Sequence, residues 1–451
     1  MTELIWEGKY KDGKKISPVR IALPFQTIET VNESAQQRQK TLDFLISEPT
    51  AKYGEEWRNR LIWGDKKYVL PSLLPEFAGK VNLIYIDPPF NVGSDFSFKA
   101  TISDNPETEE EETTRFVKQP SIIEQKAYRD TWGKGLDSYM QWFYETASLL
   151  KELLADNGSI YVHLDWHVGQ YSKIILDEIF GYDNFINEVI WCYSERGISK
   201  TYWNKKHDNI FVYAKNFGKH TFNADTVRDE YKEEYLKKFK YKDDVGMYQI
   251  RGKNIQGSPV QRADGLTPEA EKKYPGLTYR QYMKDGTLPL DWWEISLLNK
   301  ASNERVAYAT QKPEALLEKI VKASSNEDDL ILDCFCGSGT TAAVAEKNNR
   351  KWIVCDLGRF AIHTTRKRLL GIDNVKPFIV QNLGKYERQQ WMEAEFRNPE
   401  NRLQQEKSYK RFIIELYHAK PLDGYIPDGH LKIPHLWPGQ NPPPSGRQNG
   451  G

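Results

Sequence analysis

Short apolar runs that end in Asp, Gly or Asn alternate along the chain with stretches whose apolar residues recur at helical spacing. This alternation predicts an α/β fold, with a mostly parallel sheet flanked by helices. Between the first two predicted strands, the helical spacing runs over 139–154 and predicts a helix that Asn157 and Gly158 close. The predicted strands cover residues 81–87, 159–165, 209–215, 330–335, 351–356 and 378–381.

Three stretches break this alternation. Residues 105–115 are acidic and predict a solvated loop. Residues 225–300 mix Lys, Arg, Tyr, Trp, Gly and Pro without clear periodicity, which predicts an inserted domain. Residues 437–451 are rich in Pro and Gly and predict a disordered tail.

Composition narrows the setting of this fold. The chain has 451 residues, with 63 Lys and Arg against 63 Asp and Glu, so no global basic charge points to nucleic acid, although a local basic patch stays open. The four cysteines form no CxxC pair, which indicates reduced thiols and no structural zinc. Without a signal-peptide core or a membrane-spanning apolar run, we expect a soluble, cytoplasmic protein with no membrane partner.

The stretch LIYIDPPFN at 83–91 stops a buried strand with an acid, two prolines and an aromatic ring. Ligands of doubly wound sheets bind beyond the carboxyl ends of the strands, which places Asp87 where chemistry is favoured. Pro88 and Pro89 stiffen the backbone and offer carbonyl acceptors without N–H donors, and Phe90 can stack on a flat ring. The stretch predicts a site that accepts hydrogen bonds from an amine; a polar turn with an aromatic core residue is the alternative.

A second signal is LILDCFCGSGTT at 330–341, a predicted strand followed by a glycine turn and the start of a helix. The small residues Gly337 and Gly339 let a ligand approach the backbone closely at the helix start. The next predicted strand ends at Asp356, about 20 residues beyond Gly337, where a carboxylate can grip ribose hydroxyls in Rossmann-like units. These features predict a nucleoside-type cofactor, and together with the amine-accepting site they predict group transfer onto an amine.

Both motifs resemble those of the amino-methyltransferases. LIYIDPPFN looks like their motif IV, DCFCGSGTT like their S-adenosylmethionine motif I, and Asp356 like their motif II acid. The catalytic motif precedes the cofactor motif, an order that resembles the β-class permuted DNA methyltransferases, including the modification subunits of type III restriction systems. Further motifs of this family resemble LIWGDKKYVLPSLL at 61–74, SIYVHLD at 159–165, NKKHDNIFVYAKN at 204–216 and TQKPEALLEKI at 310–320.

The resemblance implies a Rossmann-like methyltransferase that uses S-adenosylmethionine to methylate the exocyclic N6 amine of a flipped-out adenine in duplex DNA, without a metal. It assigns catalysis to Asp87, Pro88, Pro89 and Phe90. It assigns cofactor binding to Asp333, Phe335, Gly337, Ser338, Gly339, Asp356, Thr310 and Lys312. For Thr310 and Lys312, the plain start of a helix at Pro313 is the alternative.

The resemblance also divides the chain into functional parts. These are an N-terminal extension (1–60), the catalytic half of the methyltransferase domain (61–224), a target-recognition insert (225–300), the cofactor-binding half (301–383), a C-terminal helical extension (384–436) and the disordered tail (437–451). The insert, in which Lys and Arg alternate with Tyr, is expected to contact DNA, with a solvated charged helix as the alternative. Nothing resembles a helicase or nuclease, so any restriction activity is expected from a separate subunit. The resemblance implies duplex DNA and a second copy in a homodimer as the other partners.

Three alternative functions stay open. Cytosine-directed members of the family more often carry Ser where this chain has Asp87, so an N4-cytosine DNA methyltransferase is the runner-up. Methylation of RNA or of protein glutamine uses related motifs, usually with Asn in the Asp position. A non-catalytic DNA-recognition subunit of a restriction-modification complex is the third alternative.

Overall fold

A mixed sheet is the centre of the computed structural model, and its strand order is β14-β9-β10-β8-β5-β15-β16-β4-β17-β3. All of these strands except β10 and β3 run in the same direction, so the predicted mostly parallel α/β fold is confirmed. The strands are β3 (Gln26–Val31), β4 (Asn59–Trp63), β5 (Val81–Ile86), β8 (Leu154–Leu164), β9 (Phe185–Cys192), β10 (His207–Ala214), β14 (Trp292–Glu294), β15 (Leu330–Asp333), β16 (Lys351–Asp356) and β17 (Phe378–Asn382).

The structure describes residues 3–31, 57–89, 98–102, 114–118, 135–193, 199–260, 264–284, 286–299, 302–306, 308 and 310–384. Phe90, most of the acidic segment 105–115, the extension 384–436 beyond Gly384 and the tail 437–451 lie outside the described residues. Within the described ranges, no helix is both long and apolar enough to cross a membrane.

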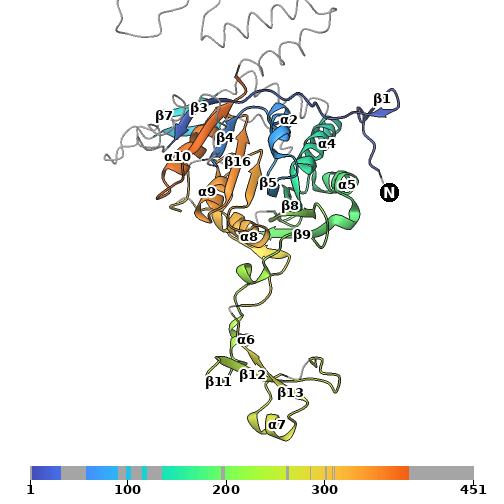
Figure 1. Cartoon of the computed structure of the whole chain (residues 1–451), viewed down its shortest axis with the longest axis vertical. Helices are drawn as coiled ribbons and strands as arrows, with labels where there is room; N and C mark the ends of the chain where they lie inside the picture. Colours follow the sequence, from blue (N-terminus) through green and yellow to red (C-terminus); the bar gives the residue numbers. More distant parts are fainter. Residues whose placement is uncertain are drawn as a thin grey trace, which may run out of the picture. The chain divides into compact units, whose positions relative to one another are not determined.

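Two layers of helices flank the sheet (Figure 1). One layer consists of α2 (Lys66–Phe77), α4 (Leu136–Leu153) and α5 (Gly169–Phe180). The other consists of α8 (Glu314–Ser324), α9 (Thr340–Lys347) and α10 (Arg359–Leu370). The apolar face that the sequence predicts for α8 packs into the core: Leu316, Leu317 and Ile320 are fully buried.

The end of α4 differs from the prediction. The helix ends at Leu153, and the N–H of the following Leu154 donates to the Leu150 carbonyl. Asn157 and Gly158 therefore do not close the helix but lie inside β8, next to a register shift in the facing strand β5. A Cβ atom at Gly158 would lie 2.9 Å from the Val81 carbonyl oxygen, so this glycine permits the close approach of two strands.

The chain between β10 and β14 leaves the main sheet and forms a small one of its own (Figure 1). Asp229 and Thr287 close the base of this insert, because each N–H donates to the carbonyl of the other, at 3.0 and 2.8 Å. The insert contains α6 (Glu233–Leu236), β11 (Tyr241–Lys242), β12 (Met247–Gly252), α7 (Pro268–Lys273) and β13 (Thr278–Tyr282). β14, which lies within the predicted insert 225–300, belongs to the main sheet.

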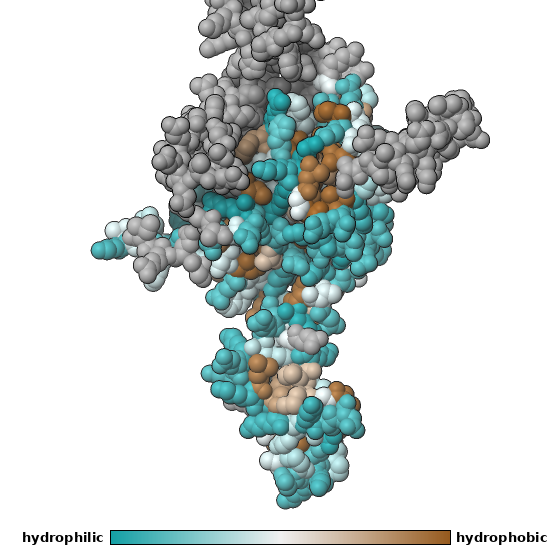
Figure 2. Space-filling model, turned by 90° about the vertical axis from the view of Figure 1, so that its left-hand side faces the viewer, coloured by the Kyte–Doolittle hydropathy of each residue, from teal (hydrophilic) through white to brown (hydrophobic). Residues whose placement is uncertain are grey.

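Tyrosines supply much of the packing inside the insert. Tyr231 stacks on Tyr235 with ring centroids 5.1 Å apart, and Tyr241 lies 5.7 Å from Tyr248. Several of the basic residues have internal partners: Lys238 pairs with Asp264, Arg228 with Asp225, and Arg251 donates to Gln281. These side chains shape the insert. The face of the insert that Figure 2 shows is largely hydrophilic, with a smaller apolar area.

The remaining described elements are short. β1 (Tyr10–Lys11) and β2 (Lys14–Lys15) form one hairpin. β6 (Phe98–Ile102) pairs with β7 (Thr114–Lys118), which begins within the acidic segment 105–115. Two 3-10 turns, η1 (Tyr182–Asn184) and η2 (Ala224–Val227), complete the set.

Candidate active site

The two sequence motifs, LIYIDPPFN and LILDCFCGSGTT, lie at the ends of neighbouring strands. β5 and β15 are parallel, hydrogen-bonded neighbours, with Leu83 opposite Ile331 and Ile84 opposite Leu332. Asp87, just after β5, and the glycine turn after β15 therefore lie at the same edge of the sheet, beyond its carboxyl end. Pro88 is buried and Pro89 half-buried, so the backbone that follows Asp87 is held by packing as well as by the proline rings.

Asp87 forms an ion pair with Lys312. The Lys312 ammonium donates to the Asp87 carboxylate, and the two side chains are 14% and 17% exposed, so the pair is partly shielded from water. The backbone of Lys312 is fixed too, because its carbonyl accepts a 3.2 Å hydrogen bond from the Thr340 hydroxyl at the start of α9. Lys312, predicted to bind the cofactor, thus contacts the predicted catalytic carboxylate, whereas Thr310 is exposed.

Asp356 holds the glycine turn. One carboxylate oxygen of Asp356 accepts from the Gly337 N–H at 2.9 Å, and the other accepts from the Gly358 N–H at 2.7 Å. The Asp356 side chain is half-buried, and each oxygen of a carboxylate can accept more than one hydrogen bond. The structure therefore joins the predicted glycine turn and the predicted acid into one unit.

Both glycines of the turn adopt a left-handed backbone, with φ of 48° at Gly337 and 74° at Gly339. A Cβ atom at Gly339 would lie 2.6 Å from the Thr365 side chain of α10, and one at Gly337 would lie 3.3 Å from Tyr308. The Gly339 N–H donates to the Cys336 carbonyl at 2.7 Å. The protein's own packing therefore already requires glycine at these positions.

Asp333 and Ser338 lie beneath the turn. The buried Asp333 carboxylate accepts from the Phe335 N–H at 2.9 Å and from the Thr341 hydroxyl at 2.6 Å. Burial raises the pKa of Asp333 to about 7, against the opposing effect of these hydrogen bonds. The buried Ser338 hydroxyl lies 3.1 Å from that of Thr340. These two predicted site residues fix the turn from the inside.

Phe335 faces a different neighbour, Trp142 of α4, with ring centroids 5.4 Å apart. The Lys66 ammonium lies 4.3 Å from the centroid of the Trp142 ring on the same side of the sheet. Burial lowers the pKa of Lys66. Phe335 is itself half-buried.

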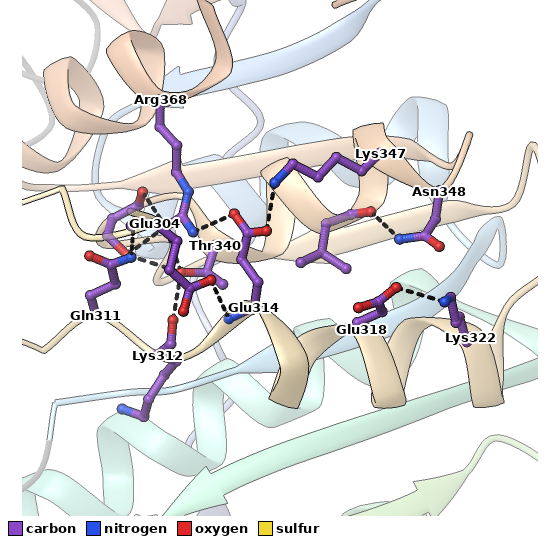
Figure 3. A network of polar contacts seen from close by, with 12 residues as sticks. Glu304, Gln311, Lys312, Glu314, Glu318, Lys322, Thr340, Lys347, Asn348 and Arg368 are labelled. Atoms are coloured by element: carbon purple, nitrogen blue, oxygen red, sulfur yellow. Dashed lines mark hydrogen bonds and ion pairs between the residues drawn. The ribbon is translucent and has the colours of Figure 1, made fainter. Parts of the chain in front are cut away.

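A polar network anchors α8, which carries Lys312 just before its start (Figure 3). The Glu314 carboxylate accepts from Arg368 of α10 at 2.8 Å and from Lys347 of α9 at 2.6 Å. Burial raises the pKa of Glu314, but these hydrogen bonds outweigh it and the pKa is lowered. Arg368 also donates to the Thr340 hydroxyl at 2.9 Å, so one buried guanidinium connects three helices at the site.

A second buried polar row crosses the sheet below Asp87. The Tyr85 hydroxyl lies 2.9 Å from His163 Nδ1, and His163 Nε2 lies 3.2 Å from the Asp208 carboxylate. These residues come from the adjacent strands β5, β8 and the start of β10. The row is two residues from Asp87 along β5 and ties its strand to the next two.

The structure therefore brings Asp87, Lys312, Gly337 and Asp356 to one edge of the sheet. Arg368 and His163 support this edge but were not predicted, because a lone Arg in a helix or a lone His in a strand carries no sequence signal of its own. All four cysteine thiols are free, and burial raises the pKa of Cys334, Cys336 and Cys355.

Comparison with known proteins places this site in a family. Type II methyltransferase M.EcaI of Enterobacter cloacae is 28% identical over 69% of this chain and 69% of its own length. The type III restriction-modification enzyme StyLTI Mod subunit of Salmonella typhimurium is 26% identical over 70% of this chain, which spans only 55% of that relative. DNA adenine methyltransferase YhdJ of Escherichia coli is 25% identical over 71% of this chain and 85% of its own length.

A family model described as DNA methylase matches residues 81–367. The match begins with β5, which leads to Asp87, includes the insert and the glycine turn, and ends next to Arg368. It covers more than half of the chain and every described residue of the site edge. On this match, the chain belongs to the DNA methylase family.

Proposed function

We propose that this chain is a site-specific DNA methyltransferase that moves a methyl group from S-adenosylmethionine to the exocyclic N6 amine of a flipped-out adenine in duplex DNA. The observation that carries the proposal is the pairing of β5 with β15, which sets Asp87 beside the turn that Gly337 and Asp356 form. An amine held by the first motif would thereby lie next to a nucleoside held by the second.

The residues at this edge fit the proposed cofactor. Asp356 presents carboxylate oxygens, already oriented by two backbone N–H groups, to ribose hydroxyls. Phe335 offers an aromatic ring, and the close packing of Gly337 and Gly339 keeps side-chain bulk away from the turn. S-adenosylmethionine, when bound, supplies an electrophilic methyl group on a sulfonium.

Asp87 and Pro88 would make the amine reactive. The adenine amine is a poor nucleophile because its lone pair is delocalised into the ring. Hydrogen bonds from its two N–H groups to the Asp87 carboxylate and the Pro88 carbonyl would favour a tetrahedral nitrogen and localise that lone pair. Because Lys312 holds one side of the Asp87 carboxylate, the incoming amine must share or displace this contact. Phe90 follows directly and is the proposed stacking partner of the base.

The identity of residue 87 as Asp favours adenine over cytosine as the methylated base. The family resemblance associates Asp at the head of motif IV with adenine, and one relative carries the name DNA adenine methyltransferase. N4-cytosine methylation keeps the same site and mechanism and is the second candidate. Methylation of RNA or of protein glutamine, or DNA recognition without catalysis, would need a different substrate or a loss of function at Asp87.

The proposed partners follow from the same resemblance. The insert is proposed to read the DNA sequence, with Lys237, Lys240 and Lys253 as candidate phosphate contacts. One relative is named as the Mod subunit of a type III restriction-modification enzyme, which supports a separate restriction subunit as a partner. A homodimer is proposed as the assembly.

Label transfer tests the proposed function. Purified protein is incubated with methyl-labelled S-adenosylmethionine and mixed-sequence duplex DNA, and the DNA is digested to nucleosides that are identified by chromatography and mass. We expect the label on the exocyclic nitrogen of adenine. Label on cytosine would keep the site but overturn the assignment of the base, and label on neither would refute the proposed reaction on duplex DNA.

A further inference from the structure

Two large aromatic side chains project into solvent from the turn between β9 and β10. Trp203 is 93% exposed and Tyr202 is 67% exposed. Burying a tryptophan is strongly favourable, so one that the fold leaves almost fully in water suggests contact with another molecule.

The turn that carries them is preorganised. The Ser199 hydroxyl accepts from the backbone N–H groups of Thr201 and Tyr202, at 3.2 and 3.3 Å. The Asn204 side chain closes the turn from the other end, because it accepts from the Ser199 N–H at 2.9 Å. Behind it, the Tyr193 N–H donates to the Lys206 carbonyl at 3.1 Å. The exposed rings therefore extend from a fixed backbone.

Strand register places this turn at the edge of the candidate active site. Ile86 of β5 lies opposite Val162 of β8, and Val162 lies opposite Phe211 of β10. β10 runs antiparallel to β8, so residues before His207 extend beyond the same edge from which Asp87 emerges. The turn and Asp87 are separated by the width of β8.

The turn is cationic as well as aromatic. Residues 199–207 include Lys200, Lys205 and Lys206 and contain no Asp or Glu. Lys205 Nζ lies 3.1 Å from the centroid of the Trp166 ring, and Trp166 follows the end of β8 and is 49% exposed. The neighbouring carboxylates have partners of their own: Asp165 pairs with His167 and Asp208 with His163. A surface that combines aromatic rings and lysines suits a polyanion with stacked bases.

We propose that the turn 199–206 contacts duplex DNA beside the target base, and that Trp203 fills the space in the helix that this base leaves. The inference rests on the proposed function and adds a wedge residue to it. Apolar and aromatic side chains that enter a base stack hold the duplex open, and a positive charge close by neutralises the adjacent phosphates. The wedge is on the catalytic body and is distinct from the insert proposed to read the sequence.

Matched alanine variants test the wedge. Trp203→Ala and Tyr202→Ala are compared with Tyr182→Ala, whose ring is 68% exposed but lies in η1, before β9, at the opposite edge of the sheet. Three quantities are measured for each variant: kcat/KM for methylation of duplex DNA, the fluorescence of 2-aminopurine at the target position, and the Kd for S-adenosylmethionine. Two DNA substrates are used, one with the target base paired and one with it mismatched.

We expect Trp203→Ala to lower kcat/KM on paired DNA at least about tenfold and to reduce the 2-aminopurine signal, with the cofactor Kd unchanged. The defect should shrink on mismatched DNA, where less energy is needed to free the base. Tyr202→Ala should have a smaller effect, and Tyr182→Ala none. A merely destabilised protein would not recover on the mismatched substrate.

Other outcomes separate the inference from the proposed function. If wild-type protein methylates DNA and Trp203→Ala does so equally on paired DNA, the wedge is wrong and the proposed function stands. If Trp203→Ala changes only the oligomeric state in solution, the turn is a contact between protein copies and the inference fails. If wild-type protein binds cofactor but methylates no duplex DNA, the proposed function fails and the wedge with it.

Discussion

Asp333 is a carboxylate whose environment opposes its charge. Asp333 is only 2% exposed, and the nearby Asp87 and Asp356 carry like charge. Burial and charge repulsion therefore both favour the protonated form of Asp333. The hydrogen bonds from Phe335 and Thr341 lessen this effect without cancelling it. Ionisation of Asp333 in the folded protein therefore costs free energy, so its contribution to stability depends on pH.

We predict that Asp333→Asn removes part of the pH dependence of stability. The pKa of Asp333 is raised from 3.8 to about 7 on folding, so between these values the folded protein binds more protons than the unfolded chain. Stability from this group is therefore complete below the unfolded pKa and is lost as pH rises to about 7, by up to about 4 kcal/mol. Asn keeps an acceptor for the Phe335 N–H but does not titrate.

The measurement is the free energy of unfolding of both proteins by denaturant from about pH 5 to about pH 8, a range that spans the folded-state pKa of Asp333. The wild-type value should decline relative to the variant as pH rises across this range. Parallel curves for the two proteins would show that Asp333 does not titrate as its burial requires.

At the level of elements, Glu314 at the start of α8 joins three helices. It has two cationic partners that differ mainly in exposure: the Arg368 side chain is 6% exposed and the Lys347 side chain 46%. A buried partner leaves an uncompensated charge when it is removed, whereas an exposed one is replaced by water. The two ion pairs of one carboxylate should therefore contribute very differently.

We predict that Arg368→Met lowers the free energy of unfolding by about 3 kcal/mol, whereas Lys347→Met lowers it by less than about 1 kcal/mol. Arg368→Met also removes the donor to Thr340, whose hydroxyl bonds the Lys312 carbonyl, so the position of Lys312 should loosen. Denaturant unfolding of both variants at pH about 7 measures the difference. Equal losses would mean that burial does not govern this network.

The sequence predicts elements where patterning is strong. The six apolar runs identified from periodicity are all strands, and β16 has the predicted bounds. Four strands of the main sheet were not predicted: β3, β4, β9 and β14. β3 is an edge strand with only one buried side chain, and β14 is only three residues long. The small sheet of the insert was missed for a related reason: its strands are short, and few of its residues are buried hydrophobics.

The candidate site was predictable only in part. Asp87, Gly337 and Asp356 were predicted from motifs at the carboxyl ends of strands, where open α/β sheets bind their ligands. The pairing of Lys312 with Asp87 joins residues 225 positions apart, and no local pattern reports it. The same holds for Arg368 and His163, whose roles depend on which helices and strands become neighbours.

At the scale of the whole molecule, the insert is a module with a closed base. Asp229 and Thr287 are hydrogen-bonded to each other, and Lys319 of α8 contacts the Asp229 side chain from the main body. The main sheet resumes with β14, whose Ile190 neighbour in β9 donates to the Asp291 carbonyl at 2.8 Å. Residues of the main body therefore contact the chain on both sides of the insert, next to where it leaves the body and where it returns.

We predict that a short Gly-Ser linker in place of residues 231–285 leaves the body folded and the cofactor site intact. The Asp229–Thr287 bridge already holds the two ends together, so closing them adds little strain. Calorimetry should give a Kd for S-adenosylmethionine within about twofold of wild type, while sequence-specific methylation is lost. Methylation of the same DNA sites at an unchanged rate would show that the insert does not recognise the target.

The claim that joins these scales is that Asp87 activates the amine while the neighbouring turn holds the cofactor. The most direct measurement is the single-turnover rate of DNA methylation by Asp87→Ala at saturating cofactor, with the cofactor Kd determined on the same sample. We predict a rate at least about 100-fold below wild type with a Kd within about twofold, because the acceptor that activates the amine is lost and the turn is not. A methylation rate equal to that of wild type would contradict the assignment of Asp87 and the account built on it.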